Sequence, residues 1–146
     1  MSILSKRPAD TYRVTFSFER TEGAEQPRSE PTPGPSFDLA TLLDLFDGDT
    51  GEIAALLAVA IASIRSDAGA IAGAAAIDDR RTILESSHRL KGTSGTIGDR
   101  RLYAISRQIE EAAADVPNPV GRLLLSELRA AVSVLSAEIA TFSLDA

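Results

Sequence analysis

The spacing of hydrophobic residues changes once along the chain, near residue 36. From Ser36 onward, apolar residues recur every three or four positions, which is typical of helices that each bury one face. Between Thr11 and Phe18, apolar and polar residues alternate, which is the pattern of a strand. The sequence therefore predicts a helical domain over residues 36–146, preceded by an extension or linker over residues 1–35 with a short strand at 11–18.

Start and stop signals divide the helical region into one short and four long segments. Ser36 is a candidate cap for the short helix, which the residues 47–49, Asp-Gly-Asp, bring to an end. The long helices are expected to begin near Thr50, Asp79 and Asp99 and after Pro119. Four long amphipathic helices joined by short turns predict an all-α fold, an antiparallel up-down-up-down four-helix bundle with the short N-terminal helix capping one end.

The expected inward positions follow from the same spacing. They are Leu39, Leu42, Leu43 and Phe46 in the short helix, then Ile53, Leu56, Leu57, Ala60, Ile61 and Ile64, then Ile83, Leu84, Ser87, Leu90, Ser94 and Ile97, then Leu102, Ile105, Ile109 and Ala113, and finally Leu124, Leu128, Ala131, Leu135, Ile139 and Phe142. Gly98 is a natural C-terminal stop for the third of these helices.

The extension has a composition of its own. Its second part, residues 22–36, carries four prolines among polar residues, which is typical of a flexible or semi-extended linker. A single strand has no sheet to join within a helical domain. The strand at 11–18 therefore docks on the bundle, pairs with another chain along its edge, or belongs to something larger, and the sequence leaves these three interpretations open.

Composition narrows the classes of partner and site. The chain of 146 residues is 44% hydrophobic but only 5% aromatic, so the core is expected to consist mainly of Ala, Leu, Ile and Val. Its 15 Lys and Arg against 21 Asp and Glu give a formal charge of -6, which argues against nucleic acid as a partner. With one histidine and no cysteine, no disulfide and no zinc site is expected, and no metal site is predicted in this chain.

Membrane association is not expected either. The first residues lack a long apolar region after their basic residues, so no signal peptide is predicted. The apolar stretch at 53–64 is expected to be too short to cross a bilayer. The sequence thus predicts a cytoplasmic protein.

The candidate chemistry is concentrated between Glu85 and Gly98. This stretch contains His88, the only histidine in the chain. On a helix, His88, Lys91 and Gly92 lie on one face because residues three and four positions apart are neighbours. Imidazole is a nucleophile near neutral pH, an ammonium group offsets charge on phosphoryl oxygens, and a glycine leaves room for a bulky donor. This patch suits the transfer of a phosphoryl group.

The motif His-Arg-Leu-Lys-Gly at residues 88–92, with Gly98 ten positions after the histidine, resembles the histidine phosphotransfer (HPt) domain family. The resemblance covers about residues 37–142. It implies that His88 is the phosphoacceptor, that Lys91 stabilises phosphoryl charge and that Gly92 gives clearance. It also implies that Glu110, twenty-two positions past the histidine, hydrogen-bonds and orients the imidazole. Two positions depart from the family pattern, where Ser87 and Asp99 replace alanines.

The resemblance also implies partners. His88 would receive a phosphoryl group from, or pass it to, an aspartate of a response-regulator receiver domain, and a histidine kinase is a further candidate donor. The receiver would supply Mg²⁺, so no cofactor is expected in this chain. The sequence has neither a phosphate-binding loop nor a nucleotide lid, and a phosphoryl-group carrier without its own kinase or ATP-binding activity is therefore expected.

Two questions stay open at this level. The chain is either a free-standing carrier or a domain of a larger kinase. The alternative function is that of a non-catalytic helical adaptor, in which His88 is incidental and the bundle binds a partner without phosphoryl transfer.

Overall fold

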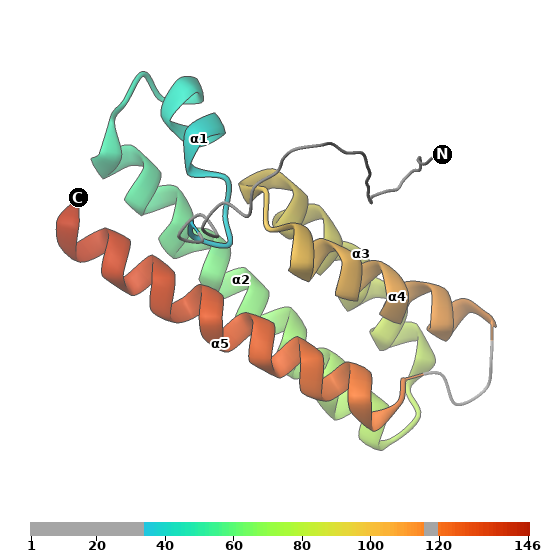
Figure 1. The fold of residues 1–146 in the computed structure, drawn as a ribbon. Coiled ribbons are helices and arrows are strands. Elements are labelled where there is room, and N and C mark those ends of the chain that lie inside the picture. The colour runs from blue at the N-terminus through green and yellow to red at the C-terminus, as the bar shows by residue number, and fades with distance from the viewer. Residues whose placement is uncertain (1–33, 116–119) are drawn as a thin grey trace, which may run out of the picture. The chain divides into compact units, whose positions relative to one another are not determined.

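A computed structural model describes residues 34–115 and 120–146, which form the five helices shown in Figure 1. The helices are α1 (Leu39–Leu45), α2 (Thr50–Ala76), α3 (Arg80–Ile97), α4 (Arg100–Asp115) and α5 (Arg122–Asp145). The all-α prediction is confirmed. The predicted strand at 11–18 and the Pro-Asn-Pro turn at 117–119 lie outside the described residues, and the division of the chain at residue 35 stays a prediction.

The four long helices pack as a bundle around one apolar core. Contacts join α2 to α3, α3 to α4, α4 to α5 and α5 to α2, so each long helix has two neighbours. The buried hydrophobic residues are Phe37, Leu42, Ile53, Leu57, Ala60, Ile61, Ile64, Ile71, Ala74, Ile83, Leu90, Ile97, Leu102, Ile105, Ile109, Ala113, Val120, Leu128, Ala131, Leu135 and Ile139. Every helix contributes residues that the spacing predicted to be inward, and the four-helix bundle is confirmed.

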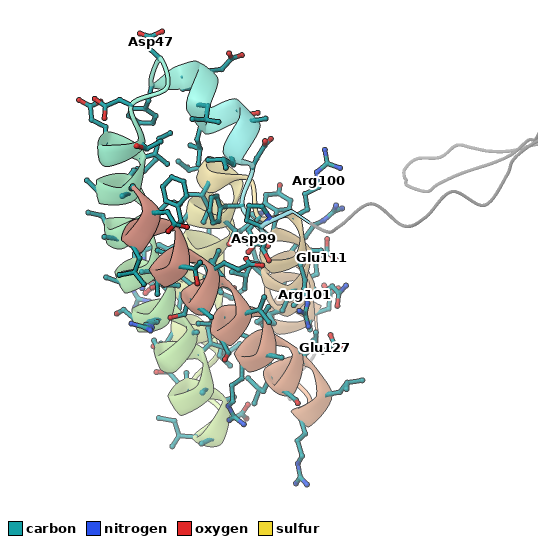
Figure 2. The ribbon with its side chains drawn as sticks, turned by 60° about the vertical axis from the view of Figure 1, so that its left-hand side comes forward. Asp47, Asp99, Arg100, Arg101, Glu111 and Glu127 are labelled. Atoms are coloured by element: carbon teal, nitrogen blue, oxygen red, sulfur yellow. The ribbon has the colours of Figure 1, made fainter. Side chains whose placement is uncertain are left out.

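Aspartates begin four of the helices. The carboxylates of Asp38, Asp49 and Asp79 each accept a hydrogen bond from the backbone N–H three residues later. Asp99 does the same for Leu102 at 3.0 Å, at the start of α4. Figure 2 shows Asp99 lying among the helices. The replacement of an alanine by Asp99 is therefore explained by capping, and burial raises the pKa of this carboxyl group.

Ser36 is not the cap of α1, contrary to the sequence-based expectation. Its backbone N–H donates to Oε1 of Glu138 on α5 at 2.8 Å, while Asp38 caps the helix through the N–H and hydroxyl of Thr41. The reason is the intervening Phe37, which is buried and packs edge to face on Phe142 with ring centroids 5.8 Å apart. Burial of Phe37 places the following residue at the helix start.

Gly98 holds α1 against the end of α3. Its φ angle of 75° ends α3 in a left-handed conformation that favours glycine. The N–H of Asp38 donates to the carbonyl of Ile97 at 2.9 Å, and a Cβ built on Gly98 would lie 2.4 Å from Cβ of Asp38. The short helix is thus joined to the α3–α4 turn at a point of close backbone approach.

The helix α2 is longer and more apolar than the stretch 53–64 suggested. It has 27 residues, and an 18-residue window reaches a mean hydropathy of 1.5, with 28% of that window buried. By length and composition it could cross a membrane, so the expectation that no apolar stretch is long enough was wrong. Alanine and glycine between 68 and 76 lengthen the apolar run. In the bundle, α2 contributes eight buried residues.

Candidate functional site

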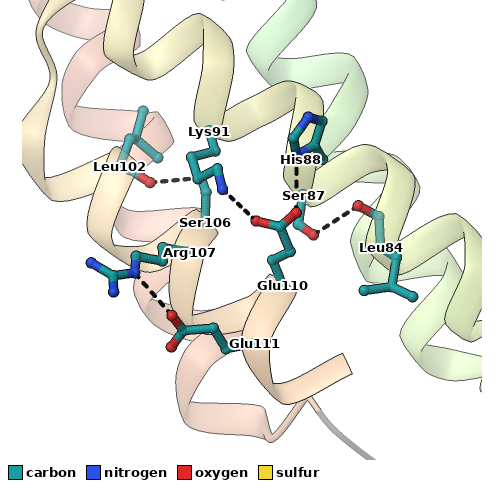
Figure 3. A network of polar contacts seen from close by, with 9 residues as sticks. All are labelled: Leu84, Ser87, His88, Lys91, Leu102, Ser106, Arg107, Glu110 and Glu111. Carbon is teal, nitrogen blue, oxygen red and sulfur yellow. Dashed lines mark hydrogen bonds and ion pairs between the residues drawn. The ribbon is translucent and has the colours of Figure 1, made fainter. Parts of the chain in front are cut away.

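His88 lies on the outer surface of α3, where its side chain is 70% exposed. One ring nitrogen, Nδ1, lies 2.9 Å from Oε2 of Glu110 on α4, as Figure 3 shows. An ionised carboxylate can only accept, so the hydrogen bond places the proton of the neutral ring on Nδ1. The lone pair of Nε2 then faces away from Glu110. The arrangement presents a nucleophilic nitrogen to solvent.

Lys91 binds the other oxygen of the same carboxylate. Its Nζ donates to Oε1 of Glu110 at 2.7 Å, and the side chains of Lys91 and Glu110 are each 25% exposed. The hydrogen bond from Lys91 is the main reason that the pKa of Glu110 lies below its ordinary value, with the hydrogen bond to His88 acting in the same direction. The same bond raises the pKa of Lys91. The site therefore keeps a charged carboxylate and a charged ammonium group beside the imidazole.

Three small hydroxyl residues of α3 and α4 are buried near this contact in the sequence of the two helices. Ser87, Ser94 and Ser106 are buried, and their hydroxyls donate to the carbonyls of Leu84, Leu90 and Leu102, one turn earlier in their own helices. No hydroxyl of the three is left without an acceptor. Ser87 therefore replaces the alanine of the family pattern without an unsatisfied polar group.

Gly92 lies one turn after His88 on an exposed part of α3. A Cβ built on it would meet no atom within 4 Å, so the described part of the bundle does not require a glycine there for packing. Gly92 lines a groove of about 510 Å³ between α2 and α3, together with Leu56 and Val59. The clearance that the resemblance implies for Gly92 stays a prediction.

The structure brings the side chains of His88, Lys91 and Glu110 together, and Gly92 lies one turn after His88 on the same helix. A model of the Hpt domain matches residues 55–138, which is more than half of the chain and includes His88, Lys91, Gly92 and Glu110. The chain belongs to the Hpt domain family. Hpt domains are helical bundles that are typically soluble and serve histidine phosphotransfer in two-component systems. Neither a search of curated proteins nor a search of solved structures found a match.

One feature of this Hpt domain was missed by sequence reasoning. On the α2 side of α3, Asp67 is buried and forms an ion pair with Arg89, the residue after the histidine. The available signal was the place of Asp67 in the apolar stripe of α2, three residues after Ile64 and four before Ile71. A carboxylate at an inward helix position indicates a specific partner.

Residues 34–115 and 120–146 contain no group of three or more His, Cys, Asp or Glu side chains that could hold a metal ion.

Proposed function

We propose that this Hpt domain is a phosphorelay intermediate, in which Nε2 of His88 exchanges a phosphoryl group with an aspartate of a response-regulator receiver domain. The observation that carries the proposal is the 2.9 Å hydrogen bond between Nδ1 of His88 and Glu110 on a ring that is 70% exposed. It combines a fixed tautomer with an accessible nucleophile, which are the two requirements for accepting a phosphoryl group.

In the forward step, the lone pair of Nε2 attacks the phosphorus of an aspartyl phosphate. The N–P bond forms while the bond between phosphorus and the aspartate oxygen breaks, and the leaving group is the aspartate carboxylate of the receiver. The imidazole becomes cationic, and it keeps its proton on Nδ1. Glu110 accepts a hydrogen bond from that proton and stabilises the positive ring. The reverse of the same step returns the phosphoryl group to a receiver.

Lys91 and Gly92 support this step in different ways. The ammonium group of Lys91, held by Glu110 beside the ring, offsets negative charge on the phosphoryl oxygens. At Gly92 nothing stands above the helix surface, so a receiver can bring its aspartate close to Nε2. The residues of this chain position and stabilise, and a Mg²⁺ ion bound by the receiver would supply further charge neutralisation.

The proposal extends to the setting of the protein. A histidine kinase is a second candidate donor, and this chain acts as a cytoplasmic carrier without ATP-binding or kinase activity of its own. Both a free-standing carrier and a domain of a larger kinase are compatible with the helical bundle. The proposed docking surface for the receiver is the exposed surface around His88, and it includes the short helix α1 and the start of α2.

Phosphoryl transfer from receiver domains tests the proposal. Receivers from the same organism are phosphorylated with acetyl phosphate and mixed with the wild-type protein or with His88→Gln. We expect acid-labile, base-stable phosphate on the wild type and none on His88→Gln, with unchanged circular dichroism for both. If no receiver transfers to the wild type and His88→Gln keeps every cellular activity, the adaptor function is correct instead.

A further inference from the structure

Asp67 breaks the apolar pattern of α2. The buried stripe of this helix consists of hydrophobic residues at 53, 57, 60, 61, 64, 71 and 74, and Asp67 stands among them with 4% of its surface exposed. A leucine would continue the pattern and avoid the cost of burying a charge. Residues that break a local rule in this way concentrate at functional positions.

The buried carboxylate holds one residue of α3. Its Oδ1 accepts from Nε of Arg89 at 3.1 Å and from Nη2 at 3.0 Å, and Nη2 also donates to the buried hydroxyl of Ser86 at 3.3 Å. The second oxygen, Oδ2, is buried and accepts no hydrogen bond from the described residues. Asp67 and Ser86 therefore fix the inner edge of the guanidinium group.

The outer edge of Arg89 remains accessible. Its side chain is 59% exposed, and Nη1 donates to no residue in the described part of the chain. Arg89 follows His88 directly and lines the same groove as Gly92, between α2 and α3. Of the five N–H donors of the guanidinium group, the two on Nη1 are left to donate to an acidic group of a partner. Because Asp67 already orders it, less side-chain entropy is lost when a partner binds.

The net charge of the chain makes an exposed cation beside His88 useful for binding an acidic partner. The protein carries a formal charge of -6, so an acidic partner is repelled overall. Lys91, the cation on the α4 side of His88, is already bound to Glu110. Arg89, the residue after His88, offers a cation on the α2 side whose Nη1 has no acceptor among the described residues.

We propose that Arg89 is a docking residue that binds an acidic group of the receiver beside His88, and that Asp67 is the residue that positions it. The inference rests on the proposed phosphorelay function. It adds that the pair determines affinity for the receiver, while the chemistry at Nε2 depends on Glu110 and Lys91.

Three variants separate docking from chemistry. Asp67→Leu removes the positioning residue, and Asp67→Leu with Arg89→Met removes both charges while the apolar volume is kept. Arg81→Ala, on the same helix as Arg89, is the control for loss of a surface charge, because Glu85 is the one ion-pair partner of Arg81 among the described residues. Each protein is labelled with phosphoramidate, a small donor that needs no docking surface, and is also assayed with a phosphorylated receiver that transfers to the wild type.

The double variant is expected to raise the KM for the phosphorylated receiver about tenfold with kcat changed less than twofold. Asp67→Leu should give a smaller rise in KM because Arg89 keeps its charge, and Arg81→Ala should match the wild type. Phosphoramidate labelling of His88 should differ less than twofold among all four proteins.

An unchanged receiver KM in the double variant would overturn the docking role. Equal losses with phosphoramidate and with the receiver would also overturn it, since the pair would then act on the site itself. Failure of the proposed function looks different: the wild type would be labelled by phosphoramidate but by no receiver, and both proposals would fall together.

Discussion

Two carboxylates face α3 from opposite sides, and they differ in how their oxygens are used. Glu110 on α4 is a quarter exposed, and its two oxygens bind His88 and Lys91. Asp67 on α2 is buried, and only one of its oxygens has a partner among the described residues, Arg89. Both oxygens of Glu110 are thus occupied by the residues proposed to act on the phosphoryl group. The second carboxylate, Asp67, fixes a cation and leaves its outer edge accessible.

The difference shows how the same ion-pair chemistry supports two tasks. A partly exposed carboxylate has a small desolvation cost, and it can reorient when the imidazole becomes cationic. These properties suit a group that stabilises a changing charge. A buried carboxylate is costly and rigid, which suits a group that holds a neighbour in one orientation. We therefore expect substitutions at Glu110 to affect the reaction rate and substitutions at Asp67 to affect stability and docking.

The largest expected effect is on the free energy of unfolding, which the substitutions of Arg89 and Asp67 should change in different directions. Arg89→Ala leaves the carboxylate of Asp67 buried without its cation and should lower the free energy of unfolding by about 2 to 3 kcal/mol. Asp67→Leu should leave this free energy unchanged or raise it, because leucine continues the apolar stripe. Urea unfolding of the two variants and the wild type measures this difference. Equal destabilisation by both substitutions would show that the ion pair itself stabilises the bundle.

The next effect concerns the rate of phosphorylation. Glu110→Ala removes the acceptor that fixes the tautomer of His88, so labelling by phosphoramidate and by a receiver should both slow about tenfold to a hundredfold. Glu111→Ala is the matched control, because Glu111 is exposed and its ion-pair partner within residues 34–115 and 120–146 is Arg107. Single-turnover labelling measures both rates. If Glu110→Ala slows labelling by the receiver but not by phosphoramidate, Glu110 acts in docking, and its role does not differ from that of Asp67.

Gly92 within α3 and Gly98 at the C-terminal cap of α3 should respond in opposite directions to substitution by alanine. Gly92→Ala adds a methyl group that meets no atom within 4 Å, so it should raise the free energy of unfolding by about 1 kcal/mol through helix propensity. It should still slow transfer from a receiver, because the methyl group stands between the two carboxylate-bound cations. Gly98→Ala should destabilise by about 1 to 2 kcal/mol or more, since its φ is 75° and its new Cβ would clash with Asp38.

Thermal unfolding and receiver transfer together check the glycine prediction. If Gly92→Ala transfers at the wild-type rate, the surface between the two ion pairs is not covered by the partner.

Most of the fold and one of the two carboxylate contacts, that of Glu110, could be predicted from the sequence. The helices follow from local spacing, and the pairing of His88 with Glu110 was implied by the resemblance to the HPt family. This pairing and that of Asp67 with Arg89 both depend on the register between neighbouring helices, which helical periodicity does not determine, and the resemblance implied no partner for Asp67. For the same reason, the contact of Gly98 with Asp38 was not predicted, because it joins residues sixty positions apart.

The choice of the first helix cap failed for a related reason. Ser36 and Asp38 both have side chains that can cap a helix. The decision between them depends on the burial of Phe37 against α5, a tertiary contact that overrides the local signal.

The smallest expected effect is the pH dependence that Glu110 on α4 gives to the free energy of unfolding. The hydrogen bond from Lys91 lowers the pKa of Glu110 from 4.5, so the contribution of Glu110 is fully present above that value and is lost as pH falls through the lower pKa of the folded protein. Wild type should therefore exceed Glu110→Gln in free energy of unfolding at pH 6, by less than about 1 kcal/mol for a pair near the surface, and the difference should vanish in acid. Urea unfolding between pH 6 and pH 3 measures this difference, with Glu111→Gln as the control for loss of one negative charge.

A Lys91→Met background separates the two hydrogen bonds of Glu110. The main cause of the lowered pKa of Glu110 is then absent, so most of the difference in free energy of unfolding between Glu110 and Gln at this position should be gone at pH 6. If the difference persists there, the hydrogen bond to His88 supplies the stabilisation, and Glu110 depends on the imidazole more than on the ammonium group.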